Sequence, residues 1–364
     1  MYIQELVDFL NTNIPLDIQE EYDNSGLLVG DTRQQLKGVL ISVDATEEVI
    51  DEAIGKEANF VLTHHPVIFS GLKNITGKNY VERTVIKAIR NNIAIYAAHT
   101  SLDNLKDGIN FKMADKLGLK NQTILKPAKN QLLKLVFFVP RDHADAVRKA
   151  VFDTGAGIVG DYEGCSYNLD GKGSFRPGEG TDPYVGQIGQ MHFEEETRVE
   201  TWLPRHKTGQ VLKAMNQAHP YEEVAYDLYP LLNSDKETGA GVIGELDEEV
   251  PEKEFLDQLK QTFNVPIIRH TKLLYSFVKR IALCGGSGSF LLEDAIAQEA
   301  DAFVSADFKY HRFFDAEDKI LIADMGHYES EAVAKDFFYE LLREKFHNFA
   351  VHLSEINTNP INYF

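Results

Sequence analysis

The feature that most constrains the fold is a recurring pattern: a continuous apolar run, then polar residues, then a helical stretch. The apolar runs lie at residues 38–43, 59–62, 92–98, 280–284, 302–304 and 319–323. Because these runs do not alternate with polar residues, strands formed by them must be buried on both faces. Such strands, separated by helices, predict an α/β fold: a mainly parallel or mixed sheet covered by helices and built in two halves.

The helical stretches carry signals at their ends as well as apolar periodicity. One helix is expected near residues 3–10, and a second begins after Thr46, whose hydroxyl can cap it. A third is expected over residues 107–117, closed by Gly118. The polar residues after each run then lie at the carboxyl ends of the strands, where sheets of this class bind ligands.

The middle of the chain follows a different pattern. Residues 132–140, 142–152, 162–175, 197–203, 207–218 and 223–228 indicate in turn a strand, a helix, two strands, a helix and a strand. This is the order of a ferredoxin-like domain. We therefore expect a ferredoxin-like α+β domain at residues 128–232, inserted into a discontinuous α/β domain made of residues 1–127 and 233–364.

Composition excludes several classes of function. The formal net charge is −19 and no dense cluster of lysine and arginine is present, which argues against nucleic-acid binding because phosphate contacts dominate such binding. No apolar run reaches the roughly 18 residues that a membrane span needs. The first residues lack a basic stretch followed by an apolar one, so we expect no signal peptide. Cys165 and Cys284 are too few for a disulfide framework, which suits a cytoplasmic protein.

Two adjacent histidines end the strand expected at residues 59–62. His64 and His65 are followed by Pro66, which disfavours helix and cannot donate to a sheet ladder, so the pair is expected where the strand stops. Adjacent side chains of an extended chain point to opposite faces, so two imidazoles in this position suit two ions better than one. A His-His-Pro sequence alone is more often a turn than a pair of ligands.

Three further candidate ligands follow other strands. Asp103 follows the run at 92–98, and His327 and Glu331, four residues apart, share one face of a helix after the run at 319–323. Mixed nitrogen and oxygen ligands suit zinc, iron(II), manganese or cobalt better than calcium. A histidine and a glutamate at this spacing are also common as a solvated pair. His327 and Glu331, however, follow a strand end equivalent to the one that carries the histidine pair, and this favours a metal site.

Three other features are open to more than one interpretation. His99 and His311 could each support a ligand by hydrogen bonding, act as a general acid or base, or be structural. The turn at residues 285–289, Gly-Gly-Ser-Gly-Ser, could hold an anion, but it lacks the lysine of a phosphate-binding loop, so tight packing is the preferred interpretation. The segment at residues 219–223, His-Pro-Tyr-Glu-Glu, could hold a ligand or form a structural elbow.

Together these motifs resemble those of the NGG-interacting-factor-three-like family, whose members are widely named GTP cyclohydrolase I type 2 homologues. The matching segments are Tyr22–Gly30, Thr63–Pro66, His99–Asp103, Gly285–Gly288, Asp307–His311 and Gly326–Glu331. The resemblance covers essentially the whole chain and indicates the long bacterial form with a middle insert. Tyr22 stands where the family often has tryptophan, and Ser305-Ala306 where it often has Thr-Gly, but neither position is a proposed ligand.

The resemblance implies a dinuclear metal centre on the five candidate ligands, His64, His65, Asp103, His327 and Glu331. It also implies a toroidal homohexamer, a trimer of dimers, with the metal sites facing an internal cavity. The insert is expected to be similar to the PII and CutA signalling proteins.

The expected function is that of a dimetal hydrolase acting on a small molecule, with a nucleotide such as GTP as candidate substrate. Two divalent ions per chain, zinc first and iron or manganese as alternatives, would acidify a water molecule and polarise the substrate. His99 would carry a proton. The alternative is a non-catalytic metal-binding regulatory or interaction protein in which the insert senses a ligand.

Overall fold

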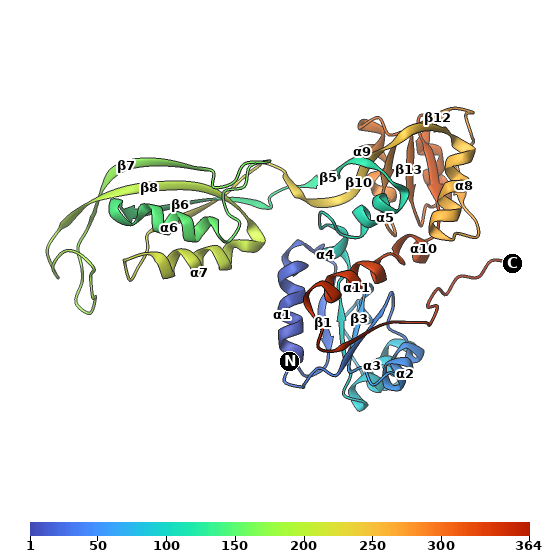
Figure 1. Cartoon of the computed structure of the whole chain (residues 1–364), viewed down its shortest axis with the longest axis horizontal. Coiled ribbons are helices and arrows are strands. Elements are labelled where there is room, and N and C mark those ends of the chain that lie inside the picture. The colour runs from blue at the N-terminus through green and yellow to red at the C-terminus, as the bar shows by residue number, and fades with distance from the viewer. The chain divides into compact units, whose positions relative to one another are not determined.

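The protein is described by a computed structural model that covers all residues from Met1 to Phe364. It divides into two compact units, one formed by residues 1–127 and 236–364 and the other by residues 128–235 (Figure 1). The first unit contains two mixed sheets with helices, so the predicted mixed α/β fold is confirmed. No helix is both long and apolar enough to cross a membrane.

A five-stranded sheet in the order β1-β4-β3-β2-β15 forms one half of the first unit. Its strands are β1 (Gly26–Val29), β2 (Gly38–Ser42), β3 (Phe60–Thr63), β4 (Ala94–Ala97) and β15 (Ala350–Leu353). All neighbouring pairs are parallel except β1 with β4. Because β2, β3 and β4 are parallel and adjacent, the residues that follow them meet at one edge of the sheet.

Helices cover both faces of this sheet (Figure 1). The helices α1 (Ile3–Asn13) and α11 (Ala334–Lys345) share a core with Ile41 and Leu62. On the opposite face, α2 (Glu47–Gly55) and α3 (Tyr80–Arg90) share a core with Leu40 and Val61. Consecutive residues of one strand are therefore buried on opposite faces, which explains why the runs are continuously apolar.

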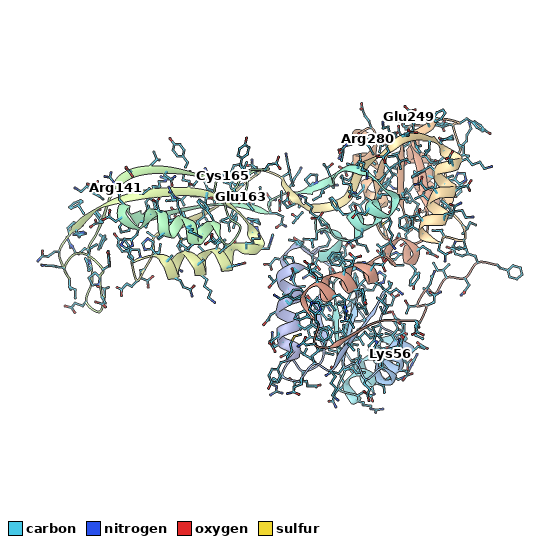
Figure 2. The ribbon with its side chains drawn as sticks, viewed as in Figure 1. Lys56, Arg141, Glu163, Cys165, Glu249 and Arg280 are labelled. Carbon is cyan, nitrogen blue, oxygen red and sulfur yellow. The ribbon has the colours of Figure 1, made fainter.

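Two predicted helix ends are confirmed. The Thr46 hydroxyl accepts a hydrogen bond of 3.3 Å from a backbone N–H in the first turn of α2. The helix α5 (Ile109–Leu117) ends at Gly118, whose φ of 75° is the left-handed conformation typical of a helix C-terminus. Lys56 lies at the end of α2 (Figure 2). It pairs with Glu52 at 3.1 Å and with Glu355 at 2.9 Å, which connects the segment after β15 to this helix.

The other half of the first unit is a six-stranded sheet in the order β11-β14-β13-β12-β10-β5. Its strands are β5 (Lys120–Ala128), β10 (Asp235–Pro251), β11 (Arg269–His270), β12 (Phe277–Leu283), β13 (Ala302–Ser305) and β14 (Leu321–Asp324). The central strands β12, β13 and β14 are parallel, whereas β10 is antiparallel to β12 and β11 is antiparallel to β14. One face packs against α5 and α8 (Glu252–Phe263), the other against α9 (Leu292–Ala297) and the 3-10 helix η5 (Tyr310–Ala316).

The sequence predicted one sheet in two halves, but the strands form two separate sheets. The reason is that a continuous apolar run shows that a strand is buried without showing which strand it pairs with. Both sheets contribute to a shared core, which contains Phe60 and Tyr96 from the first sheet together with Ile281 and Val304 from the second.

The second unit is a four-stranded antiparallel sheet in the order β7-β8-β6-β9 with two helices. Its elements are β6 (Leu132–Pro140), α6 (Ala144–Phe152), β7 (Ser166–Phe175), β8 (His192–Pro204), α7 (Thr208–Ala218) and β9 (Tyr226–Pro230). The two helices cover one face, around Phe137 and Val199. The prediction that the last strand begins at residue 223 is wrong by three residues, since β9 begins at Tyr226. Glu222 lies in the preceding loop, where it accepts hydrogen bonds from the Asp182 N–H.

Candidate metal centre

The end of β3 fixes both histidines of the His-His-Pro motif. The backbone N–H groups of His64 and His65 both donate to the carbonyl oxygen of Val43, at 3.1 and 3.0 Å. This shared acceptor lies where the strand ends, as the proline predicted. Because the chain is no longer extended there, both rings lie in the same region, and the prediction that they point to opposite faces is wrong. Their ring centroids lie 4.9 Å apart with an interplanar angle of 48°.

Glu331 connects the ligands that come from different strand ends. It lies in α10 (His327–Glu331), which follows β14, and Asp103 lies in α4 (Thr100–Asp103), which follows β4. Glu331 Oε1 is 3.6 Å from His64 Nε2, and Oε2 is 2.8 Å from His65 Nε2. Glu331 Oε2 is also 3.0 Å from His327 Nε2, and Asp103 Oδ1 is 3.6 Å from His64 Nε2. The structure therefore brings all five predicted ligands together.

Several of these atoms lack the partners that buried polar atoms normally have. His64 Nε2, Asp103 Oδ1 and Glu331 Oε2 are buried and make no hydrogen bond of ordinary geometry. Leaving such atoms unpaired costs free energy, whereas coordination of divalent cations would satisfy them. Two sets, His64 with His65 and His99, and His65 with His327 and Glu331, each offer ligand atoms within 4.8 Å of one another. The donor set therefore fits a metal ion.

Each histidine is held by a hydrogen bond to the nitrogen that faces away from this centre. His65 Nδ1 lies 2.7 Å from Asp44 Oδ1, and His327 Nδ1 lies 2.8 Å from Asp307 Oδ2. His64 Nδ1 contacts a backbone carbonyl oxygen, that of residue 98, at 2.9 Å. These contacts leave each Nε2 facing inward, which is how proteins orient metal-binding histidines.

The roles of Asp44 and Asp307 were not predicted from the sequence, although a signal was present. Each aspartate is the second residue after a strand, Asp44 after β2 and Asp307 after β13, and so reaches the same strand ends as the candidate ligands. An aspartate at such a position can serve a ligand without being one.

The carboxylates create a strongly negative environment. Burial opposes protonation of His65, but its close contacts with the carboxylates of Asp44 and Glu331 outweigh burial and raise the pKa of His65 to about 10. Burial also opposes protonation of His327, but its carboxylate partners Asp307 and Glu331 outweigh burial and raise the pKa of His327 to about 11. Burial, together with the nearby Glu331, raises the pKa of Asp103 to about 8. A divalent cation would neutralise the same negative charge that these shifts reflect.

His99 lies beside the histidine pair and is itself held by an aspartate. Its ring centroid is 5.3 Å from that of His64 and 5.5 Å from that of His65. His99 Nδ1 lies 2.8 Å from Asp23 Oδ1, and Asp23 also accepts hydrogen bonds from Thr100. Burial opposes ionisation of Asp23, but the hydrogen bonds from His99 and Thr100 outweigh it and hold its pKa well below the ordinary value.

The glycine-rich turn after β12 packs against Glu331. Gly286 has a φ of +57°, and a Cβ added to it would lie 2.1 Å from Glu331 Oε1. The Gly286 N–H donates to the Ser330 hydroxyl at 2.9 Å, one residue before Glu331. This close approach agrees with the preferred interpretation of the turn as a tight packing element, and it places the glycine directly behind the carboxylate.

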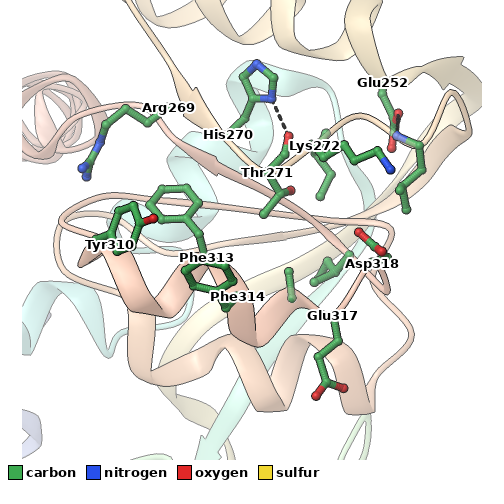
Figure 3. A pocket seen from close by; sticks show the side chains of 14 residues that line it. Glu252, Arg269, His270, Thr271, Lys272, Tyr310, Phe313, Phe314, Glu317 and Asp318 are labelled. Atoms are coloured by element: carbon green, nitrogen blue, oxygen red, sulfur yellow. Dashed lines mark hydrogen bonds between the residues drawn. The ribbon is translucent and has the colours of Figure 1, made fainter.

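A hollow of about 690 Å³ lies beside β11 and η5 and contains none of the predicted ligands (Figure 3). Arg269 and Lys272 line it together with aromatic rings, and the Arg269 guanidinium lies 5.6 Å from the centroid of Phe313. His311 belongs to η5, is exposed and packs against Tyr310 with ring centroids 5.2 Å apart. The structure does not bring His311 to the candidate metal centre. Of the interpretations given above for His311, a structural role is therefore the one that we keep.

Comparison with known proteins places the chain in a family. The family described as Duf34/NIF3 (NGG1p interacting factor 3) matches residues 1–360. The chain belongs to this family. It is 39% identical to a GTP cyclohydrolase 1 type 2 homolog of Halalkalibacterium halodurans and 34% identical to one of Bacillus subtilis, each over 99% of this chain and 98% of the relative. The crystal structure of a Bacillus cereus protein related to NIF3 matches with a TM-score of 0.86 and 38% identity, over 100% of this chain and 99% of that one. The resemblance inferred from the motifs is confirmed.

Proposed function

We propose that this chain is a hydrolase that binds two divalent ions and uses them in catalysis. The observation that supports this proposal best is the position of Glu331, whose two oxygens face different donors. Oε1 faces His64, while Oε2 faces His65 and His327. Glu331 would therefore hold one ion together with His64 and Asp103, and the other together with His65 and His327. Zinc is the proposed metal, with iron or manganese as alternatives, because all three accept mixed nitrogen and oxygen ligands.

When bound, such ions acidify a water molecule and polarise an electrophilic carbon or phosphorus atom. The chain's own residues would orient the ligands and move a proton. Asp44 and Asp307 hold His65 and His327 with Nε2 turned inward. His99 is the proposed proton carrier, because Asp23 fixes Nδ1 and leaves the other ring nitrogen available for exchange. The proposed substrate class is a nucleotide such as GTP, in keeping with the name that the relatives carry.

The first test compares Glu331→Gln with Glu329→Gln, a matched change on the same helix. Glutamine keeps the size of the side chain but removes the bridging charge, so Glu331→Gln should lose metal in elemental analysis while Glu329→Gln retains it. Circular dichroism should show that both variants are folded. Retention of both ions by Glu331→Gln would refute the role assigned to Glu331, and a native protein that binds fewer than two ions per chain would refute the dinuclear assignment.

The second test asks whether the metals do chemistry. Native protein loaded with zinc, iron or manganese is offered a panel of nucleotides and phosphoesters, and product formation is followed by chromatography. Turnover that disappears in Glu331→Gln and persists in Glu329→Gln would support a hydrolase. A fully loaded protein that turns over none of the panel would favour a non-catalytic role.

The alternative that we propose is a metal-binding regulatory protein with a ligand-sensing insert. It is favoured by the second unit, whose order of strand, helix, two strands, helix and strand supports a ferredoxin-like domain similar to PII and CutA. A cavity on the sheet of this unit gives the sensing role a candidate site. Deleting residues 128–232 should abolish any ligand response but preserve metal binding. An unchanged ligand response would contradict the sensing role.

We also propose a toroidal homohexamer, a trimer of dimers, located in the cytoplasm. Exposed aromatic side chains on η5 support a contact surface, since Tyr310 is 73% exposed and Phe314 is 65% exposed. Light scattering should give the mass of six chains, and Tyr310→Ser should lower it. A native protein that stays monomeric at micromolar concentration would contradict this assembly.

A further inference from the structure

A cavity lies on the face of the second unit's sheet that α6 and α7 do not cover. The side chains of Phe137 and Val199 point into the core under the helices. Side chains alternate between the two faces of a strand, so Phe138, one residue after Phe137, and Glu196, three residues before Val199, face the other side. The segments at residues 177–185 and 221–225 cover part of that side and enclose about 420 Å³, enough for a small organic molecule.

Aromatic rings form much of the wall of this cavity. Phe138, Phe175, Tyr184 and Tyr221 all line it. The ring of Tyr221 lies 5.9 Å from that of Phe175 and 6.2 Å from that of Tyr184, measured between centroids. The faces of such rings carry negative electrostatic potential and attract cations that come within about 6 Å. One ring already does so, because the Arg198 guanidinium lies 5.9 Å from the centroid of Phe138.

A buried carboxyl group lies among these rings. Glu196 is only 9% exposed, and its Oε1 accepts a hydrogen bond of 3.0 Å from the Tyr221 hydroxyl. Neither oxygen is paired with a lysine or an arginine; Arg198, two residues further along β8, pairs with Glu200 instead. Burial raises the pKa of Glu196, and the Tyr221 hydrogen bond only partly offsets this effect.

The backbone leaves room for this carboxyl group at the cavity. A Cβ added to Gly173 would lie 2.0 Å from Glu196 Oε2, so any larger residue at 173 would displace the carboxyl group. Glu222 and Glu223 also line the cavity, and no lysine or arginine does. The local charge therefore disfavours an anionic ligand and favours a cationic one.

We propose that this cavity binds a small organic cation, a primary ammonium group carried on an aromatic or other flat apolar body. The ammonium group donates to Glu196 Oε2, and the body packs between Phe175, Tyr184 and Tyr221. A cation among aromatic rings with one buried carboxylate gains both a charged hydrogen bond and cation–π attraction. This inference does not depend on the metal centre, since none of the residues involved is a proposed metal ligand.

The test uses the full-length protein and three related probes in isothermal titration calorimetry: phenethylamine, neutral 2-phenylethanol and anionic phenylacetate. The amine should bind at least about tenfold more tightly than the alcohol, because a hydrogen bond to a charged group and cation–π attraction together exceed the 1.4 kcal/mol that a factor of ten represents. Equal affinity for the amine and the alcohol, or no binding of the amine, would overturn the proposal.

Variants locate the site and separate it from general effects on folding. Glu196→Gln should weaken amine binding about tenfold or more while the matched surface change Glu195→Gln leaves it intact. Gly173→Ala should weaken binding without any change of charge, because the added Cβ meets the carboxyl group. Zinc content and the unfolding temperature of each variant are measured in parallel. Native amine affinity in folded Glu196→Gln would refute the site, whatever the outcome for the metal centre.

Discussion

Replacing Gly286 by alanine tests how closely the glycine turn controls the metal centre. The added Cβ would lie 2.1 Å from Glu331 Oε1 and 3.3 Å from a carbon of the His327 ring, whereas ordinary contacts begin near 3.4 Å. The Glu331 carboxylate must therefore move by about 1 Å. The neighbouring change Gly285→Ala is a matched control, because its Cβ would lie 3.4 Å from the nearest atom, Glu331 Cγ, and its backbone is not left-handed.

The expected magnitude follows from the tolerance of metal sites. Metal–ligand distances vary by only about 0.2 Å, so a shift of about 1 Å would move Glu331 out of the position of the proposed ligand. We expect the affinity for zinc to fall at least about 100-fold, which corresponds to about 2.7 kcal/mol less stabilisation by the metal. The left-handed φ of +57° should cost alanine a further 1–2 kcal/mol or so in the metal-free protein.

Two measurements separate these effects. Competition with a chromophoric chelator gives the zinc affinity, and urea unfolding with and without zinc gives the free energy of unfolding of both forms. Gly286→Ala should lose most of the difference between the two unfolding curves, and Gly285→Ala should keep it. Native zinc affinity in Gly286→Ala would refute the role assigned to the turn behind Glu331.

Three other changes give independent tests. Asp44→Asn keeps the shape of the partner of His65 but removes its charge, and should lower zinc affinity about 10- to 100-fold in the same competition assay; an unaltered affinity would argue against a supporting role. Thr46→Ala removes the cap of α2 and should lower the free energy of unfolding by about 1 kcal/mol, with zinc stoichiometry unchanged. Glu82→Gln should lower the urea midpoint at pH 7. Backbone hydrogen bonds from the preceding loop hold the pKa of Glu82 at about 2, below its ordinary 4.5. This stabilisation is present above pH 4.5 and lost as the pH falls toward 2, so the two proteins should converge there; a constant difference would contradict the assignment.

Patterns local to a few residues predicted much of this molecule. The apolar runs and their polar ends located the strands, the Thr46 cap and Gly118 located helix ends, and the spacing of His327 and Glu331 placed both on one helix. These predictions succeed because the causes act over one or two turns of chain. The gathering of ligands followed from one further rule, that parallel strands end at the same edge of a sheet.

The features that sequence patterns missed depend on contacts between distant segments. Asp44 and Asp307 lie 21 and 20 residues from the histidines that they orient. Their place after strands indicates that they reach the same edge of a sheet, but not which histidine each one contacts. The division into two sheets depends on strand pairing, which a buried apolar run does not specify. The approach of Gly286 to Glu331 likewise requires a three-dimensional structure, although a glycine-rich turn after a strand was a visible hint.

The order of the ligands along the chain has a consequence for biosynthesis. His64, His65 and Asp103 precede His327 and Glu331 by more than 200 residues. At roughly 5–20 residues per second, a ribosome needs about 10 to 50 s to reach Glu331 after Asp103 has been made. During that interval the nascent chain carries an incomplete set of donors. An ion bound by the complete set of donors would connect the end of the first sheet to α10, the helix that follows the last parallel strand of the second sheet. Tight metal binding would therefore be possible only after synthesis and folding of the whole chain.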